Sequence, residues 1–267
     1  MYNTGVFWYL LMFYEEGMIE NTWIYGSKIA HKGLHNKQYP ENSLGAIQNA
    51  IDHGYPFEID VYMISDGTIA VMHEFNLKHM CGVNIDIRTL KREDLKKYKL
   101  LNTEYTIPTL EEVLELTRGQ VPIMVELKSF AIFSIGKFEQ KVYDIMKHYD
   151  GEYAIQAFNP LVISWFKKNA PEVLRGQLWC LFEDVEGLPR LAKHILRKMY
   201  LTKRGRPDFL AYSTDDISKK YLKKFKKTPK LGWVIHDEKQ EEKANEIFSG
   251  VIFEDYLPDT TTESKKA

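Results

Sequence analysis

Short runs rich in valine and isoleucine recur eight times along this chain, with helix-like stretches between them. We expect strands in these runs, near 28–31, 56–62, 121–127, 153–158, 174–181, 208–213, 230–235 and 250–254. Strands that alternate with helices predict parallel βα units. Eight such units predict an α/β fold of the (β/α)8 TIM barrel type, which typically takes about 250 residues. The chain has 267 residues.

The expected helices have recognisable ends. Ser43 to His53 follows a Pro-Glu-Asn entry and stops before Gly54, a residue suited to ending a helix. Thr109 and Glu112 form a capping box, which begins a helix that ends at Gly119. Five further helices are expected over 137–149, 159–169, 186–200, 216–227 and 238–248.

The connection after the second strand differs from the others. Residues 65–68 read Ser-Asp-Gly-Thr, a turn signal that predicts a hairpin-like extension of that strand over 68–73. The stretch 74–108 is then too long for an ordinary βα connection. We interpret it as an excursion over the barrel mouth, with a short helix near 91–97.

Both chain ends lie outside the expected barrel, which covers residues 28–258. Val6 to Tyr14 is an apolar and aromatic run. It is too short for a bilayer span of about 20 residues, and its flanks do not fit a signal peptide. We expect 1–27 to pack on the domain, and membrane contact is the alternative. Residues 259–267 predict a frayed tail.

Composition narrows the class of protein. The net charge of −1 argues against a nucleic-acid partner. Two cysteines, Cys81 and Cys180, indicate reduced thiols in a cytoplasmic protein. Residues 188–199 have helical apolar spacing with basic residues opposite, typical of an outer barrel helix. Peripheral contact with an anionic membrane is the less favoured interpretation. Oligomeric state is left open.

Three carboxylates fall at the ends of neighbouring expected strands. Glu58 and Asp60 are two residues apart, so their side chains share a face about 6.6 Å apart along the strand. Glu126 would join them from the next strand. Converging carboxylates repel one another unless a cation compensates them. Oxygen ligands favour one divalent cation, Mg²⁺ or Ca²⁺. The alternative is that these residues form outward-facing salt bridges.

Two histidines lie at the same end of the expected barrel. His31 ends the first strand and His73 ends the extension of the second. Imidazole titrates near neutral pH, so both are candidates for general acid and base catalysis. The alternative for each is a hydrogen-bonded core histidine or a metal ligand.

Four more residues are candidates for substrate binding. Lys32 and Lys128 can place positive charge against a phosphate oxygen. The alternative for each lysine is a solvated surface position. Gln156 ends the fourth expected strand and Trp233 lies in the seventh. Trp233 would either pack in the core or form an apolar wall for a glycerol or acyl group.

Taken together, these segments resemble the glycerophosphodiester phosphodiesterase family. The segments are His31-Lys32-Gly33, Pro40-Glu41-Asn42-Ser43, Glu58-Ile59-Asp60-Val61, His73 and Glu126-Leu127-Lys128, in that order. The resemblance implies hydrolysis of a glycerophosphodiester to an alcohol and glycerol phosphate. It also implies that His31 and His73 act as the acid and base. Glu58, Asp60 and Glu126 would then hold the cation, and Lys128 would contact the phosphate.

The chain departs from the family pattern at four positions. Lys32 stands where arginine is usual, Glu74 where aspartate is usual, Ala157 where serine is frequent, and Glu254 where threonine or serine is frequent. Two alternative functions therefore stay open. One is phospholipase-D-like hydrolysis of lysophospholipids, and the other is a catalytically weak phosphodiester-binding protein.

Overall fold

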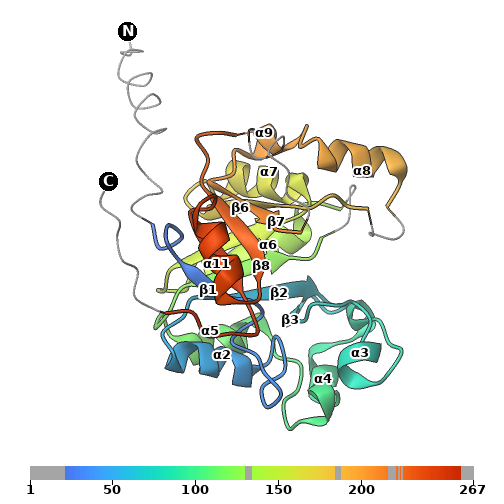
Figure 1. The fold of residues 1–267 in the computed structure, drawn as a ribbon. Coiled ribbons are helices and arrows are strands. Elements are labelled where there is room, and N and C mark those ends of the chain that lie inside the picture. The colour runs from blue at the N-terminus through green and yellow to red at the C-terminus, as the bar shows by residue number, and fades with distance from the viewer. Residues whose placement is uncertain are drawn as a thin grey trace.

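Eight parallel strands form a closed ring in the structure (Figure 1). The computed structural model describes residues 22–129, 134–183, 188–215, 221, 223 and 225–259. The ring consists of β1 Lys28–Ala30, β2 Phe57–Met63, β4 Ile123–Leu127, β5 Tyr153–Ala157, β6 Leu174–Trp179, β7 Phe209–Ser213, β8 Lys230–Ile235 and β9 Gly250–Phe253. It closes because β1 pairs in parallel with both β2 and β9. The expected (β/α)8 barrel is confirmed.

Helices cover the outside of this ring. The longer ones are α2 Leu44–Asp52, α5 Leu110–Thr117, α6 Lys137–Met146, α7 Pro160–Asn169, α8 Arg190–Arg197 and α11 Glu238–Asn245. Ser43 caps α2 by accepting a hydrogen bond from the N–H of Ala46, and the predicted capping box of Thr109 and Glu112 begins α5. These local signals therefore located the helix starts correctly.

Some helices are shorter than expected. Helix α6 ends at Met146, and the hydroxyl of Tyr149, beyond its end, accepts a hydrogen bond from the N–H of Gly119. Helix α8 begins only after Pro189. A one-turn helix that was not expected, α9 Thr202–Gly205, follows it. The helix expected over 216–227 falls mostly outside the described residues.

Two apolar layers hold the barrel together. Between sheet and helices, Phe57, Ile59 and Val61 of β2 are fully buried. Inside the ring, side chains such as Met124 and Phe209 form a second cluster. Full burial of each such large apolar side chain contributes about 1.5–3 kcal/mol. Because Phe57, Ile59 and Val61 face outward, Glu58 and Asp60 between them face the barrel interior.

The excursion after β2 is a small lobe beside β2 and β3 (Figure 1). Strand β3, Ile69–Val71, pairs antiparallel with β2 outside the ring, as expected for the extension. The lobe also contains α3 Lys78–Cys81, η1 Ile87–Thr89, α4 Arg92–Leu95 and η2 Leu100–Asn102. Buried side chains including Leu77, Met80 and Leu95 form its own core. The expected helix near 91–97 is confirmed as the shorter α4, and the other three elements were not predicted.

The described parts of both chain ends are tied to the barrel. Ile24 and Trp23 pack against the interior cluster at the amino ends of the strands. The carbonyl of Pro258 accepts a hydrogen bond from the Tyr55 hydroxyl, and that of Asp259 accepts one from Lys28 at 2.8 Å. Val6 to Tyr14 and residues 260–267 lie outside the described residues. None of the helices in the described ranges is long and apolar enough to cross a membrane.

Candidate active site

The three expected carboxylates meet at the carboxyl ends of β2 and β4. Asp60 is the register partner of Glu126, and Glu58 lies two residues earlier on the same face. One oxygen from each of the three side chains lies within 4.8 Å of the others. All three residues are buried. Outward-facing salt bridges, the alternative interpretation, are therefore wrong.

Burial sets the electrostatics of this cluster. Burial and the neighbouring charges of Asp60 and Glu126 raise the pKa of Glu58 well above its usual range. Burial also raises the pKa of Glu126, to about 7, although Lys128 opposes the shift. For Asp60, burial is outweighed by Lys128 and His73, and its pKa falls to about 2. The raised pKa values of Glu58 and Glu126 indicate that Lys128 alone does not compensate the negative charge of the three carboxylates.

A divalent cation fits this donor set. The ammonium of Lys128 lies 3.0 Å from Glu126 Oε1 and 3.3 Å from Asp60 Oδ1. One lysine against three carboxylates leaves two negative charges when all are ionised. The donors are all oxygen, which suits Mg²⁺ or Ca²⁺. Glu58, Asp60 and Glu126 could hold one such ion.

Residues of the first βα loop orient two of these carboxylates. The side chain of Asn42 donates to Asp60 Oδ2 at 2.9 Å and accepts from the Asp60 N–H at 3.1 Å. The N–H of Lys32 donates to Glu58 Oε2 at 3.1 Å. Asn42 was not among the expected site residues, although it belongs to the Pro-Glu-Asn-Ser motif. Its role could have been found only by knowing that this loop returns over β2.

Both expected lysines are buried at the barrel mouth. Burial opposes the charged form of Lys32, but Glu41 at 3.0 Å outweighs it, and the pKa of Lys32 rises. Burial likewise opposes the charged form of Lys128. The negative charges of Glu126 and Asp60 outweigh this effect and hold the pKa of Lys128 above its usual range. Neither side chain is a solvated surface lysine, so that alternative is wrong. Glu41 is a second site residue that the sequence analysis did not select.

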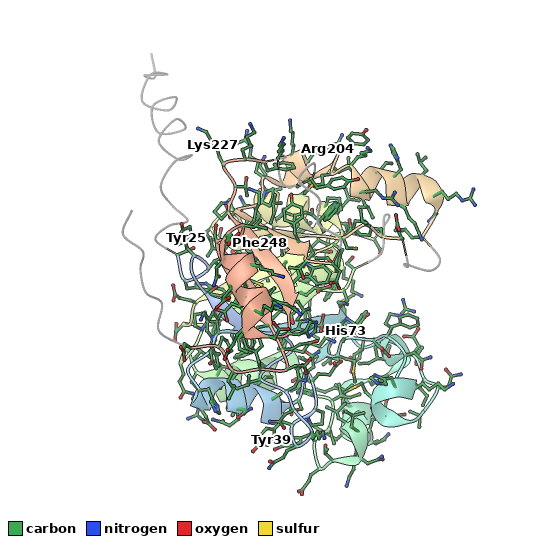
Figure 2. All side chains as sticks on the ribbon, in the orientation of Figure 1. Tyr25, Tyr39, His73, Arg204, Lys227 and Phe248 are labelled. Carbon is green, nitrogen blue, oxygen red and sulfur yellow. The ribbon has the colours of Figure 1, made fainter. Side chains whose placement is uncertain are left out.

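His73 lies between the barrel and the excursion, beside β2 and β3 (Figure 2). Burial lowers its pKa to about 4, against the opposing charge of Asp60. The carboxylate of Asp60 is therefore close enough to act on the His73 ring. The charges of Lys128 and Lys32 lower the pKa of His73 further.

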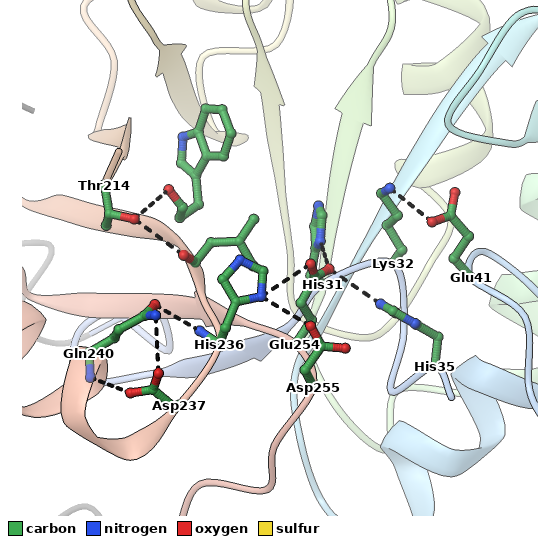
Figure 3. Close-up of polar contacts among 12 residues, drawn as sticks. His31, Lys32, His35, Glu41, Thr214, His236, Asp237, Gln240, Glu254 and Asp255 are labelled. Carbon is green, nitrogen blue, oxygen red and sulfur yellow. Dashed lines mark hydrogen bonds and ion pairs between the residues drawn. The ribbon is translucent and has the colours of Figure 1, made fainter. Parts of the chain in front are cut away.

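His31 has a different set of contacts from His73. Its Nδ1 is 2.5 Å from Glu254 Oε2 (Figure 3). His35 Nε2 lies 3.3 Å from the same oxygen, and His236 Nδ1 lies 3.5 Å from Glu254 Oε1. Neither Glu254 nor His35 was selected as a site residue from the sequence. Their convergence places four ionisable side chains at the rim of the barrel.

The two remaining candidates have buried polar atoms. Gln156 is the register partner of Glu126, and its Oε1 is buried with no hydrogen-bond partner among the described residues. The Nε1 of Trp233 is likewise buried and has no partner within the described ranges. The indole packs edge-on against Phe158, with ring centroids 5.7 Å apart. Trp233 thus packs in the barrel interior while keeping one donor unpaired.

The model of the Glycerophosphoryl diester phosphodiesterase family matches residues 31–198, more than half of the chain. The chain belongs to this family. The matched region contains His31, the three carboxylates, His73, Lys128 and Gln156. The resemblance drawn from the motifs is confirmed.

Individual relatives within the family are distant. A Glycerophosphodiester phosphodiesterase from Bacillus altitudinis is 31% identical over 155 residues, which cover 54% of this chain and 62% of the relative. Lysophospholipase D GDPD1 from Rattus norvegicus is 28% identical over 158 residues, covering 53% and 48%. The match to these curated relatives thus spans about half to three-fifths of their length.

Solved structures agree in fold. A phosphodiesterase from Oleispira antarctica, in complex with the product sn-glycerol-3-phosphate, superimposes with a TM-score of 0.71 at 21% identity, covering 86% of this chain and 94% of that one. A glycerophosphodiester phosphodiesterase from Thermotoga maritima gives 0.65 at 24% identity, covering 86% and 95%. At identities of 21% and 24%, the similarity to these structures shows a shared barrel fold only.

Proposed function

We propose that this protein is a phosphoric diester hydrolase that cleaves glycerophosphodiesters to an alcohol and glycerol phosphate. The observation that carries the proposal is the buried cluster of Glu58, Asp60 and Glu126 with Lys128 at the carboxyl ends of the strands. Active sites of (β/α)8 barrels lie at that end. Family membership and the product bound to the Oleispira antarctica phosphodiesterase support the substrate class.

The proposed cation site consists of Glu58, Asp60 and Glu126. When bound, Mg²⁺ or Ca²⁺ would supply positive charge to the phosphoryl oxygens and favour ionisation of the attacking group. Asn42 and the N–H of Lys32 hold Asp60 and Glu58 in place by hydrogen bonds. The side chains therefore need little reorganisation to accept the ion.

In the proposed reaction His31 and His73 move the protons. One accepts a proton from the nucleophile, and the other gives a proton to the leaving alkoxide. The bond between phosphorus and the alcohol oxygen breaks, and water supplies the new oxygen on phosphorus. A glycerol hydroxyl attacking first, with a cyclic intermediate, and direct attack by water both fit these residues.

Four side chains would position the substrate. Lys128 and Lys32 would place their ammonium groups against phosphate oxygens. The unpaired Oε1 of Gln156 and the Nε1 of Trp233 would hydrogen-bond to the glycerol or phosphate. An unpartnered buried polar atom costs about 1–3 kcal/mol, and a bound substrate would remove that cost.

Steady-state kinetics tests the proposal. Glycerophosphocholine, glycerophosphoethanolamine and glycerophosphoglycerol should be hydrolysed with Mg²⁺ or Ca²⁺, and exhaustive chelation should abolish turnover. Asp60→Asn should remove both metal binding and activity. Asp144→Asn, at an exposed ion pair on α6, is the matched control and should leave both unchanged. Full turnover after chelation, or no turnover with any metal, would reject the proposal; the latter leaves the phosphodiester-binding alternative.

Lysophospholipids are the second candidate substrate. The similarity to Lysophospholipase D GDPD1 supports this class. Helix α8 supports it too, because Leu191 is 71% exposed between the basic residues Arg190 and Lys193. Activity on lysophosphatidylcholine at or above that on glycerophosphocholine would favour it. Replacing Leu191 with serine should then reduce activity on vesicle-bound substrate only.

We further propose a single catalytic barrel over residues 28–258 in a cytoplasmic protein. The net charge of −1 and the two free cysteines support this placement, and they give no support to a nucleic-acid partner. Residues 1–27 would pack on the domain, with peripheral membrane contact as the alternative. Cell fractionation of the full chain and of a chain that lacks residues 1–21 separates these cases.

A further inference from the structure

The contact between His31 and Glu254 stands apart from the carboxylate cluster. His31 Nδ1 and Glu254 Oε2 are 2.5 Å apart, and each side chain is only 20% exposed. Burial would raise the pKa of Glu254, but hydrogen bonds from His31 and His35 outweigh it and hold the pKa well below its usual range. Glu254 is therefore an ionised carboxylate against the His31 ring.

Closure of the barrel dictates this pairing. In the register of β1 and β9, Ala30 lies opposite Phe253, so the next residue of each strand, His31 and Glu254, lie side by side. The His31 N–H donates to the Phe253 carbonyl at 2.9 Å, and the Glu254 N–H donates to the Ile235 carbonyl at 2.9 Å. Both backbones are thus fixed by the sheet.

The short distance distinguishes a hydrogen bond from a shared metal ion. Two ligands of one tetrahedral zinc ion, each about 2.0–2.1 Å from the metal, lie roughly 3.3 Å apart. At 2.5 Å, His31 Nδ1 and Glu254 Oε2 are too close for that arrangement, and they form a short hydrogen bond instead. We therefore interpret this group as a hydrogen-bonded network in which both His31 and His35 contact Glu254.

We propose that Glu254 is a positioning residue that makes His31 the catalytic base. This inference rests on the proposed hydrolysis of phosphodiesters. A neutral imidazole carries one N–H, so donation from Nδ1 to Glu254 leaves Nε2 with a free lone pair. No described residue hydrogen-bonds to His31 Nε2. The proton of the attacking hydroxyl passes to Nε2, and the imidazolium that forms is stabilised by the Glu254 carboxylate.

Two further histidines, His35 and His236, contact the Glu254 carboxylate. His35 shares Oε2 of Glu254, while His236 faces its Oε1 and also Asp255, at 3.1 Å (Figure 3). In the described part of the chain these histidines are the charged or titratable side chains in contact with Glu254, together with His31. His35 hydrogen-bonds to the same oxygen as His31, and His236 lies 3.5 Å from the other oxygen, so both histidines hold the Glu254 carboxylate beside His31.

Kinetics with two leaving groups provides the first test. Wild-type protein and the Glu254→Gln, Glu254→Asp and Asp144→Asn variants are assayed on glycerophosphocholine and on a p-nitrophenyl phosphodiester. Loss of one charge-assisted hydrogen bond should reduce kcat about ten- to a hundredfold in Glu254→Gln. The loss should be equal on both substrates, because an activated leaving group removes the need for an acid but not for a base. Glu254→Asp should recover part of the rate, and Asp144→Asn, at an exposed ion pair on α6, should match wild type.

Nuclear magnetic resonance of 15N-histidine provides a test that needs no turnover. In wild type the His31 resonances, assigned with His31→Gln, should show the tautomer protonated at Nδ1, and Glu254→Gln should lose this preference. This result separates failure of the inference from failure of the proposed function. The Nε2-protonated tautomer in wild type, unchanged kcat in Glu254→Gln, or a loss confined to glycerophosphocholine would overturn the assignment.

One further outcome would replace the hydrogen-bond network with a metal site. In calorimetry with ZnCl₂, the Asp60→Asn protein, which lacks the first cation site, should show no tight binding. Stoichiometric zinc binding that His35→Ala abolishes would overturn the positioning role.

Discussion

In the metal-free protein, Glu126→Gln should increase stability at pH 8 and decrease it once a divalent cation is added. Glutamine keeps the size of the side chain and stays neutral at every pH. Glu126 itself is buried beside Asp60, so its ionised form is disfavoured in the folded state. The variant removes this unfavourable charge together with one proposed metal ligand.

The magnitude follows from the pKa of Glu126. Burial first, and then the Asp60 charge, raise it from the usual 4.5 to about 7 against the pull of Lys128. A carboxyl group whose pKa is higher in the folded protein stabilises the fold fully below pH 4.5, and this contribution is lost as pH rises toward 7. At about 1.36 kcal/mol per pH unit, wild type loses about 3 kcal/mol by pH 8. For a chain of this size that corresponds to about 6–12 °C in Tm.

Thermal unfolding at pH 5, 6, 7 and 8 with a chelator measures this difference. The Tm gap between Glu126→Gln and wild type should grow with pH, and an exposed control, Glu115→Gln, should show no gap. A cation at a thousand times its Kd should stabilise wild type by about 4.1 kcal/mol and reverse the order at pH 8. A variant less stable than wild type at pH 8 in chelator, or a gap independent of pH, would refute the reasoning.

Three further changes test other parts of the molecule. His73→Ala should lower kcat roughly 10²–10⁴-fold on glycerophosphocholine but much less on a p-nitrophenyl diester, because the proposed acid is protonated His73, a form that the negative charge of a bound phosphate would favour against burial; equal losses on both would contradict this role. Lys32→Ala should lower kcat/KM about ten- to a hundredfold while Lys32→Arg preserves it, because arginine keeps the charge near Glu41 and the phosphate; an unchanged value in Lys32→Ala would remove Lys32 from the site. Thr109→Ala should lower the free energy of unfolding in urea by about 1 kcal/mol, since Thr109 caps α5; the Thr103→Ser change, at a half-buried position that keeps its hydroxyl, serves as a conservative comparison in the excursion.

The barrel could be predicted because its signals are local. Each strand is a short apolar run, and caps such as Ser43 and Thr109 lie directly before their helices. The excursion was only partly predictable. Its one-turn elements depend on side chains such as Asn76 and Asp86, which accept hydrogen bonds from Lys78 and Arg88, and on a core that exists only after folding.

The carboxylate cluster could also be predicted, because residues at the ends of adjacent parallel strands share one edge of the sheet. Glu58, Asp60 and Glu126 come from consecutive strands of the ring, so their proximity follows from chain order. Asn42 and Glu41 lie in a loop, and no periodicity in the sequence says where a loop side chain points. Their contacts with Asp60 and Lys32 appear only in three dimensions.

Glu254 is different, because the information that locates it was present in the prediction but not used. Once a barrel of eight strands is expected, its first and last strands must be neighbours. The residue after the first strand, His31, then has to lie near the residue after the last strand, Glu254. His236, which follows β8, joins the same rim for the same reason. A carboxylate at that position was noted only as a departure from the family pattern. Because the ring closes, this glutamate contacts His31, the proposed catalytic base. The exchange of threonine or serine for Glu254 therefore has a chemical consequence that the rate and the tautomer of His31 can measure.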